Sequence, residues 1–307
     1  MKTEHWIILG FGAVVVGMAA FLEARAGPYK KGPEITVETI TMGTKLPKIW
    51  LFYDNSEINS REWADFGSRT SHVINIPLLN LLYQTIVMAN GDKYKVEVIG
   101  GLTGVAELLG EDAMPAQLKK GSVGVAELDW IRTAVLAKFG GLWLSPAVLC
   151  MKGFGDLPSD KIVAFGEEDE SMYGSFNTPG FRALWCPNAG NQVMIDWERR
   201  IRDRLESQLG GLQIRGDAKS DWAEIDKEVV EVRRKAEFGR KADGKKLELE
   251  DIFSNASPVS VPSQAIYMAI PYRELLDRRI FGWVLKTSEE DLLRSNTFIS
   301  NILNRLL

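Results

Sequence analysis

The chain has 307 residues and a mass of 34.3 kDa; 45% of its residues are hydrophobic and 25% are charged. These proportions are those of a folded soluble protein, and they exclude a disordered chain, a collagen-like chain and a multi-span membrane protein. Lys and Arg number 37 against 41 Asp and Glu, a net charge of -4. Such a balance leaves no broad basic surface, so nucleic acid is not an expected partner.

Histidine and cysteine are scarce, which limits the chemistry that the chain can perform. His5 and His72 are the only histidines, and Cys150 and Cys186 are the only cysteines. These numbers are too small for a histidine-based triad, a multi-histidine metal site, a disulfide scaffold or a zinc cluster. Any metal or acid–base chemistry must therefore depend on carboxylates. The two cysteines either pair in an oxidising compartment or remain free buried thiols.

The N-terminal region differs from the rest of the chain. Residues 1–5 form a short tail before an uncharged apolar stretch at 6–22. As a helix this stretch is roughly 25 Å long, which is short but workable for a bilayer core. We therefore expect a single-pass membrane protein of the secretory pathway or of a viral or cell envelope, with its orientation open. A cleavable signal peptide ending near Ala24-Arg25-Ala26 and a buried core helix are the alternatives.

The remainder divides into a stalk and one large domain. Residues 23–45 are rich in glycine and proline and predict a stalk, and residues 46–307 predict a globular domain. Short apolar runs alternate there with stretches of helical periodicity. The expected strands are 48–53, 94–99, 142–144, 162–165 and 172–176, and the expected helices are 76–88, 123–139, 191–205 and 298–306. This alternation predicts an α/β fold with a mostly parallel sheet flanked by helices.

A charged segment at 215–251 has a different composition. Trp222, Ile225, Val229 and Val232 recur in it at helical spacing. This pattern predicts a solvated amphipathic helix followed by a glycine-interrupted loop.

The segment 127–144 carries the most specific pattern in the chain. It predicts a helix that ends at Gly140-Gly141, where a left-handed C-cap needs glycine, followed at once by a strand. Asp129 and Arg132 are three residues apart and therefore lie on one face of this helix. Ligands of open α/β sheets bind at the carboxyl ends of the strands, so the residues after Leu144 are expected to lie at a binding site.

These motifs resemble a known family. The Asp-x-x-Arg pattern at 129–132 and the Gly-Gly-Leu-Trp-Leu run at 140–144 resemble the nucleotide-sugar-binding region of glycosyltransferases with the GT-A (Rossmann-like) fold. The subgroup resembled contains capsular polysaccharide synthesis proteins, yeast-type mannosyltransferases and the sugar-transferring domain of large clostridial toxins. The run 46–52 resembles the opening strand of that subgroup, and the tract 185–197 resembles its later turn and helix.

The resemblance implies a donor site. It implies that Asp129 and Arg132 contact the ribose and diphosphate of a UDP- or GDP-sugar, and that Arg132 and Lys138 stabilise the departing diphosphate. It also implies that Trp50 stacks on the base, and that a hexose passes to a glycan or glycoprotein acceptor with retention of anomeric configuration. From the residues alone, Asp129 and Arg132 are equally an ion pair on a helix surface, and Trp50 is a core residue.

One part of the family pattern is missing. The family's metal-binding Asp-x-Asp should occupy positions 145 and 147, where it would hold the Mn²⁺ or Mg²⁺ that bridges the diphosphate. This chain has Ser145-Pro146-Ala147, a degenerate DXD motif without a carboxylate. Ser145 is thus a candidate substrate-binding residue, no metal ligand is assigned, and the catalytic residues are unknown. Asp156 and the acidic run 167–170 are candidate replacements, although a solvated acidic turn explains that run as well.

Three functions remain open at this point. The first is a membrane-anchored glycosyltransferase that moves a hexose from a sugar nucleotide to a glycan or protein acceptor. The second is a catalytically inactive protein of the same fold, acting as a structural or scaffold component, for example of a membrane-associated or viral assembly. The third is a sugar-nucleotide or glycan-binding protein without turnover.

Overall fold

A computed structural model describes residues 46–54, 76–120, 123–166, 181–209, 217–234, 247–255 and 261–307. The chain divides into two compact units, Met1–Thr36 and Val37–Leu307, and every described residue belongs to the second. Several predicted features lie outside the described residues: the tail 1–5, the span 6–22, the stalk 23–45, the acidic run 167–170 and the strand 172–176.

The expectation of an N-terminal transmembrane helix and a single-pass membrane location is not upheld. In the described part of the chain, no helix has both the length and the apolar character needed to cross a bilayer. The longest described helix, α6 (Gln192–Leu209), carries acidic and basic side chains along its exposed face. It is an amphipathic helix that buries one face against the protein core. The anchor and the membrane location are therefore withdrawn.

Six strands form the main sheet in the order β2-β1-β3-β6-β5-β7. β1 is parallel to β2 and β3, and β5 is parallel to β7, whereas β6 is antiparallel to both of its neighbours. The strands are β1 (Lys48–Tyr53), β2 (Lys95–Gly100), β3 (Gly141–Leu144), β5 (Ile162–Gly166), β6 (Ala183–Cys186) and β7 (Val230–Arg234). The α/β class and the parallel-dominated sheet are confirmed, with one antiparallel strand that the sequence pattern did not predict.

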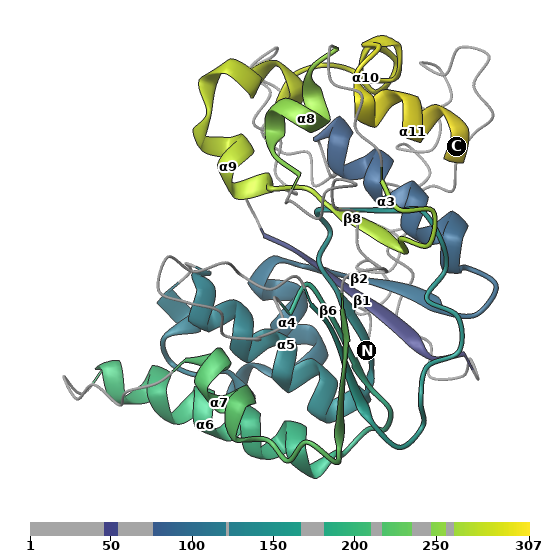
Figure 1. Cartoon of the computed structure of the whole chain (residues 1–307). Coiled ribbons are helices and arrows are strands. Elements are labelled where there is room, and N and C mark those ends of the chain that lie inside the picture. The colour runs from purple at the N-terminus through teal and green to yellow at the C-terminus, as the bar shows by residue number, and fades with distance from the viewer. Residues whose placement is uncertain are drawn as a thin grey trace, which may run out of the picture. The chain divides into compact units, whose positions relative to one another are not determined.

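Four helices lie beside this sheet (Figure 1). α5 contacts β3 and β6 and packs along α6, while α4 contacts β2 and α5, and α7 contacts α6. These helices are α4 (Gly101–Leu109), α5 (Val125–Phe139), α6 and α7 (Ala218–Glu224). Trp50, Trp130 and Trp197 are buried in one apolar cluster between the helices and the sheet. Burial of these large side chains supplies much of the driving force for this packing.

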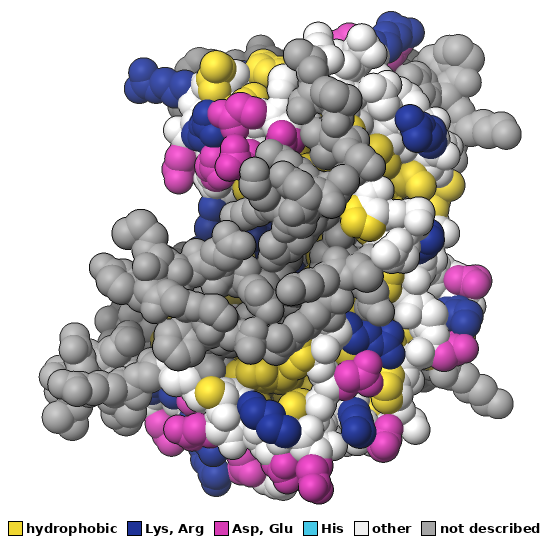
Figure 2. All heavy atoms as spheres, viewed as in Figure 1, with side chains coloured by type: hydrophobic (Ala, Val, Ile, Leu, Met, Phe, Trp, Pro, Cys, Tyr) yellow, Lys and Arg dark blue, Asp and Glu magenta, His cyan; other side chains and the backbone are white. Residues whose placement is uncertain are grey.

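A second group of elements surrounds a two-stranded antiparallel sheet of β4 (Val148–Cys150) and β8 (Tyr267–Ala269). α3 (Pro77–Asn90) packs against β4 and also contacts α10 (Glu289–Arg294) and α11 (Phe298–Leu306), as Figure 1 shows. The remaining elements are α8 (Leu249–Phe253), α9 (Tyr272–Asp277) and the 3₁₀ helices Glu111–Ala113, Leu118–Lys120 and Arg279–Leu285. On the face seen in Figure 2, acidic and basic side chains of the described residues are interspersed.

The predicted helix in the segment 215–251 is wrong beyond its first turns. α7 ends at Glu224, and Val230–Arg234 is a strand that pairs in parallel with β5. Val229, Val230 and Val232 are β-branched, and such side chains favour a strand when a neighbouring strand is available. The helical spacing of the apolar residues was therefore overridden by pairing with a strand that is distant in sequence.

Candidate functional site

The candidate site lies at the carboxyl edge of the parallel strands. β1, β2 and β3 run in the same direction, so their last residues lie at one edge of the sheet. α5 leads into β3 from the opposite direction, which places the first turns of the helix at this same edge. The fold thus brings Asp129 and Arg132 to the edge at which Ser145 follows β3.

Arg132 and Ser145 are anchored on consecutive residues of one segment. Arg132 Nη1 donates to the carbonyl oxygen of Phe181 at 3.1 Å, and Ser145 N donates to the carbonyl oxygen of Arg182 at 2.7 Å. The second bond continues the antiparallel register in which Leu144 lies opposite Ala183. The segment that leads into β6 therefore joins two residues that the sequence pattern had singled out separately.

Asp129 and Arg132 form a buried ion pair. Arg132 Nη2 donates to Asp129 Oδ1 at 2.5 Å, and the two side chains are only 5% (Arg132) and 15% (Asp129) exposed. Burial raises the pKa of Asp129, and the nearby charge of Arg132 opposes that rise. Burial likewise lowers the pKa of Arg132, opposed by Asp129. The alternative of a solvated pair on the helix surface does not describe this geometry, because the surrounding protein excludes most water.

Arg132 keeps one donor without a partner. Its Nε is buried and has no hydrogen-bond acceptor among the described residues. Leaving such a donor unsatisfied costs about 1–3 kcal/mol. Arg132 therefore keeps hydrogen-bonding capacity inside the protein that no described residue uses.

Phe181 occupies a strained position at the same place. Its φ is 50°, in the left-handed region, which costs a bulky residue about 1–3 kcal/mol. The guanidinium carbon of Arg132 lies 4.9 Å from the centre of its ring. The ring centres of Trp197 and Trp222 lie 5.2 Å and 5.5 Å from the ring centre of Phe181. This packing holds the strained residue where Arg132 and Ser145 meet.

Trp50 lies in the core rather than on the site surface. The side chain is 0% exposed, and its Nε1 donates to the carbonyl oxygen of Gly140 at 2.8 Å. Its ring centre lies 5.4 Å from that of Phe139. No face of the Trp50 ring is open to a nucleotide base, so the core-packing interpretation describes it and the expected stacking role is corrected.

Two other candidate residues lie away from this edge. Lys138 is in the last turn of α5 and donates to the carbonyl oxygens of Leu108 and Leu109, at 3.1 Å each, at the end of α4. Asp156 Oδ1 pairs with Lys93 Nζ at 2.9 Å, next to the start of β2 and hence at the amino edge of the sheet. Lys138 therefore caps a helix, and Asp156 does not replace a missing metal ligand.

The expected divalent metal does not fit the residues present at the carboxyl edge. Ala147 is 8% exposed, and its carbonyl oxygen accepts a hydrogen bond from Ile270 N at 2.9 Å, which joins this position to the end of β8. Ala147 N donates to Ser145 Oγ at 3.4 Å. Among the residues that the structure describes, no group of three or more His, Cys, Asp or Glu could hold a metal ion. A hard divalent cation needs carboxylate oxygens, which serine, proline and alanine do not supply.

Arg182 is a site residue that the sequence analysis did not identify. Directly opposite residues of an antiparallel pair point to the same face, so Arg182 and Ser145 share one face at the sheet edge. Arg182 is half-buried. The sequence feature that could have identified Arg182 is its position immediately before the apolar run Ala183–Cys186. That feature points to the site only once β6 is known to pair with β3.

The two cysteines are both free and buried. Burial raises the pKa of Cys150 to about 12 and that of Cys186 to about 11, so both thiols are unreactive packing residues. The alternative of free buried thiols therefore describes this structure, and the disulfide alternative does not.

No family model matches the chain, and no curated protein matches it in sequence. Several solved structures resemble it. The PaToxG glycosyltransferase is 14% identical with a TM-score of 0.34, over 54% of this chain and 62% of that chain. The galactosyltransferase LgtC, crystallised with donor and acceptor sugar analogues, is 12% identical with a TM-score of 0.36, over 62% of this chain and 75% of its own.

A third resembling structure is a glycosyltransferase involved in the glycosylation of the major capsid protein of PBCV-1. It is 12% identical with a TM-score of 0.34, over 73% of this chain and 95% of its own. The chain thus spans about three-fifths of the PaToxG glycosyltransferase. All of these identities and TM-scores are low, and likenesses at this level do not establish a function.

Proposed function

We propose that this chain is a glycosyltransferase-like protein of the GT-A type that binds a UDP- or GDP-sugar at the carboxyl edge, beside Asp129, Arg132 and Ser145. The observation that carries the proposal is the meeting of Arg132 and Ser145 on the consecutive carbonyls of Phe181 and Arg182. The resemblance assigns Arg132 to the diphosphate, and Ser145 stands at the position of the family's metal-binding aspartate, so their common anchoring supports a single site for both.

The charge of the diphosphate would be balanced by arginine rather than by a metal. Arg182 shares a face with Ser145, the position at which the family has a metal-binding aspartate. Arg132 lies behind it with a buried Nε that no described residue satisfies. Guanidinium groups bind diphosphates strongly and stay charged throughout the reaction. Fixed cations at this place would stabilise the charge that develops on the departing nucleoside diphosphate as the hexose passes to a glycan or glycoprotein acceptor.

A specific observation favours a second candidate, a catalytically inactive protein of the same fold with a structural role. Ala147 is bonded to the strand pair β4–β8 through Ile270, so this position serves to hold the fold together. Asp129 and Arg132 also neutralise each other. Both features suit a structural role, which needs neither metal ligands nor turnover of a sugar nucleotide.

Titration of the full chain with UDP- and GDP-hexoses, with Mn²⁺ or with EDTA, tests the proposal by calorimetry. We expect binding that EDTA does not abolish, and an Arg182→Gln variant that binds about tenfold more weakly, because it loses a charged hydrogen bond. Arg199→Gln is the matched control, since Arg199 is exposed on α6 and pairs with Asp196. The absence of binding by every sugar nucleotide would refute the proposal. Binding without release of nucleoside diphosphate in the presence of acceptors would favour the inactive alternative.

A further inference from the structure

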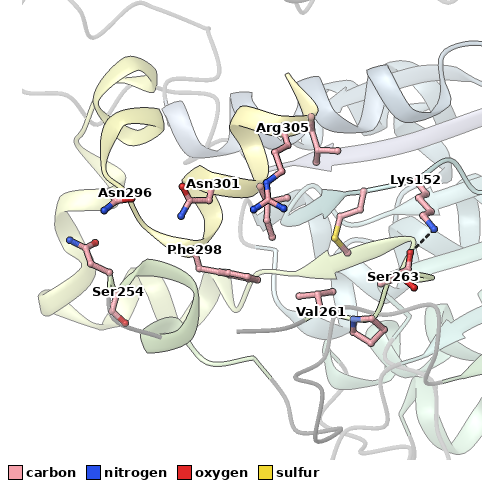
Figure 3. Close-up of a pocket in the computed structure, with 14 residues that line it drawn as sticks. Lys152, Ser254, Val261, Ser263, Asn296, Phe298, Asn301 and Arg305 are labelled. Atoms are coloured by element: carbon pink, nitrogen blue, oxygen red, sulfur yellow. Dashed lines mark hydrogen bonds between the residues drawn. The ribbon is translucent and has the colours of Figure 1, made fainter. Parts of the chain in front are cut away.

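A recess lies away from the carboxyl edge (Figure 3). It has a volume of about 550 Å³ and is bounded by α11, by the end of α8 and by the residues that follow β4. Ser145 lies before β4, and the recess begins after it at Met151, so the two sites lie at opposite ends of that strand. Its volume lies within the range of small-molecule sites in proteins.

The recess is positively charged. Arg305 on α11 and Lys152 after β4 line it, and none of its lining residues is acidic. Arg305 is exposed and forms no hydrogen bond or ion pair within the described ranges. Lys152 Nζ donates to the carbonyl oxygen of Ser263 at 2.5 Å, which holds the ammonium at one end of the recess. In a chain with a net charge of -4, this local excess of cations favours an anionic ligand.

Three amides and two serines, Ser254 and Ser263, are the other polar side chains of the recess. Asn255, Asn296 and Asn301 line it, and their side-chain amides have no hydrogen-bond partner among the described residues. Figure 3 shows Asn301 and Arg305 projecting from α11, with the ring of Phe298 beside them. Amides offer both donors and acceptors, as a set of sugar hydroxyls requires, and an apolar ring can pack against the C–H face of a sugar.

We infer that this recess binds a carbohydrate that carries an oxyanion, a sugar phosphate or a sugar carboxylate, at a site distinct from the proposed sugar-nucleotide site. The oxyanion lies at Arg305, whose guanidinium provides charge-assisted hydrogen bonds, and the ammonium of Lys152 adds positive charge to the same recess. The hydroxyls lie along the three asparagines, and the ring of Phe298 covers an apolar face of the sugar.

Glucose 6-phosphate, glucuronic acid, glucose and inorganic phosphate are the probes, each titrated into the full chain and followed by NMR or calorimetry. We expect at least one of the two anionic sugars to bind more tightly than both glucose and phosphate, and the pair to show whether phosphate or carboxylate is preferred. Arg305→Gln should weaken that binding about tenfold, because a charged hydrogen bond is lost at an exposed position that tolerates glutamine. Arg294→Gln is the control: Arg294 is an exposed arginine on α10 that pairs with Glu290, and this variant should bind as the parent does.

Several outcomes would overturn the inference. If glucose bound as tightly as the anionic sugars, the oxyanion would not be recognised. If inorganic phosphate bound as tightly, the carbohydrate would not be recognised. Unchanged binding by Arg305→Gln would show that the recess is not the binding site. Asn301→Ala separates recognition of the hydroxyls from charge: it should weaken the binding of the anionic sugar and leave that of inorganic phosphate unchanged. Arg182→Gln should leave this binding intact, which distinguishes the recess from the sugar-nucleotide site.

Discussion

At the scale of single residues, Arg132 has more contacts than its sequence pattern indicated. It pairs with Asp129, donates to the carbonyl oxygen of Phe181 and packs on the ring of that residue. The pKa of Asp129 is nevertheless raised, because the cost of burying its carboxylate exceeds the stabilisation that Arg132 provides. The pair is therefore a weak source of stability by itself, and removing one partner leaves the other charge buried.

Arg132→Met should lower the free energy of unfolding by about 3 kcal/mol at neutral pH, because Asp129 then stays buried without a cation. Because the folded-state pKa of Asp129 is above the unfolded value, the contribution of Asp129 to the free energy of unfolding is greatest at acidic pH and is lost as the pH rises through the folded-state pKa. That fall should be larger and extend to higher pH in Arg132→Met, which removes the charge opposing the rise in the pKa of Asp129. Urea unfolding measured from acidic to neutral pH checks this.

Two further variants serve as controls for this prediction. Asp129→Asn combined with Arg132→Met should lose the pH dependence that Asp129 contributes and recover part of the stability. Arg199→Met breaks the exposed pair with Asp196, which has the same spacing on α6, and should cost no more than about 0.5 kcal/mol. If Arg132→Met followed the same pH profile as the parent chain, the buried-pair interpretation would be wrong.

At the scale of elements, the connection from α5 to β3 positions the site. Gly140 has φ 65° and Gly141 has φ 95°, so the chain turns from helix to strand within two residues. A Cβ on Gly141 would lie 2.6 Å from the carbonyl oxygen of Lys48, which belongs to the neighbouring strand β1. The close approach of β3 to β1, and hence the position of Ser145, depends on this glycine.

Gly141→Ala should destabilise the protein by roughly 2 kcal/mol more than Gly110→Ala, because only the Cβ at position 141 would push strand β3 away from the backbone of Lys48 on β1. Both glycines have a left-handed backbone, with φ 95° at Gly141 and 99° at Gly110, and a Cβ on Gly110 meets nothing within 4 Å. The conformational penalty is thus matched between the two variants. Thermal or urea unfolding compares them, and equal losses of stability would show that the contact with Lys48 is unimportant.

At the scale of the whole molecule, the run Ser145-Pro146-Ala147 offers no carboxylate to a metal ion. Ser145 follows a strand of the main sheet, whereas Ala147 is bonded to the second sheet through Ile270. The motif therefore connects the two groups of elements. Side chains placed at these two positions lie where the carboxyl edge and the second sheet meet.

Restoring Ser145→Asp and Ala147→Asp together should create binding of a UDP- or GDP-sugar that Mn²⁺ strengthens by about tenfold or more, since two carboxylates supply hard oxygen ligands. The matched control is Ser145→Asn with Ala147→Asn, which has the same shape without the charge. Calorimetry with and without Mn²⁺ gives the comparison, after circular dichroism shows that each variant is folded. If both variants responded to Mn²⁺ in the same way, positions 145 and 147 would not correspond to the metal-binding aspartates of the family.

Much of the fold followed from local patterns. The strands predicted over 48–53 and 162–165 and the helices predicted over 123–139, 191–205 and 298–306 match the observed bounds or differ from them by at most four residues. Apolar runs and helical periodicity report burial, and burial is what local sequence encodes best. β6 and β7 were missed or misassigned, because both depend on neighbours far away in the chain.

By itself the sequence determined the α/β class, the turn at Gly140-Gly141, the proximity of Asp129 to Arg132 on one helix and the absence of carboxylates at positions 145 and 147. All of these depend on residue identity and short-range geometry. Only the tertiary structure decided that Trp50 is buried, that Arg182 lies opposite Ser145, and that Arg305 and Lys152 line one recess. Those relations join residues far apart in the chain, and strand pairing and side-chain packing establish them.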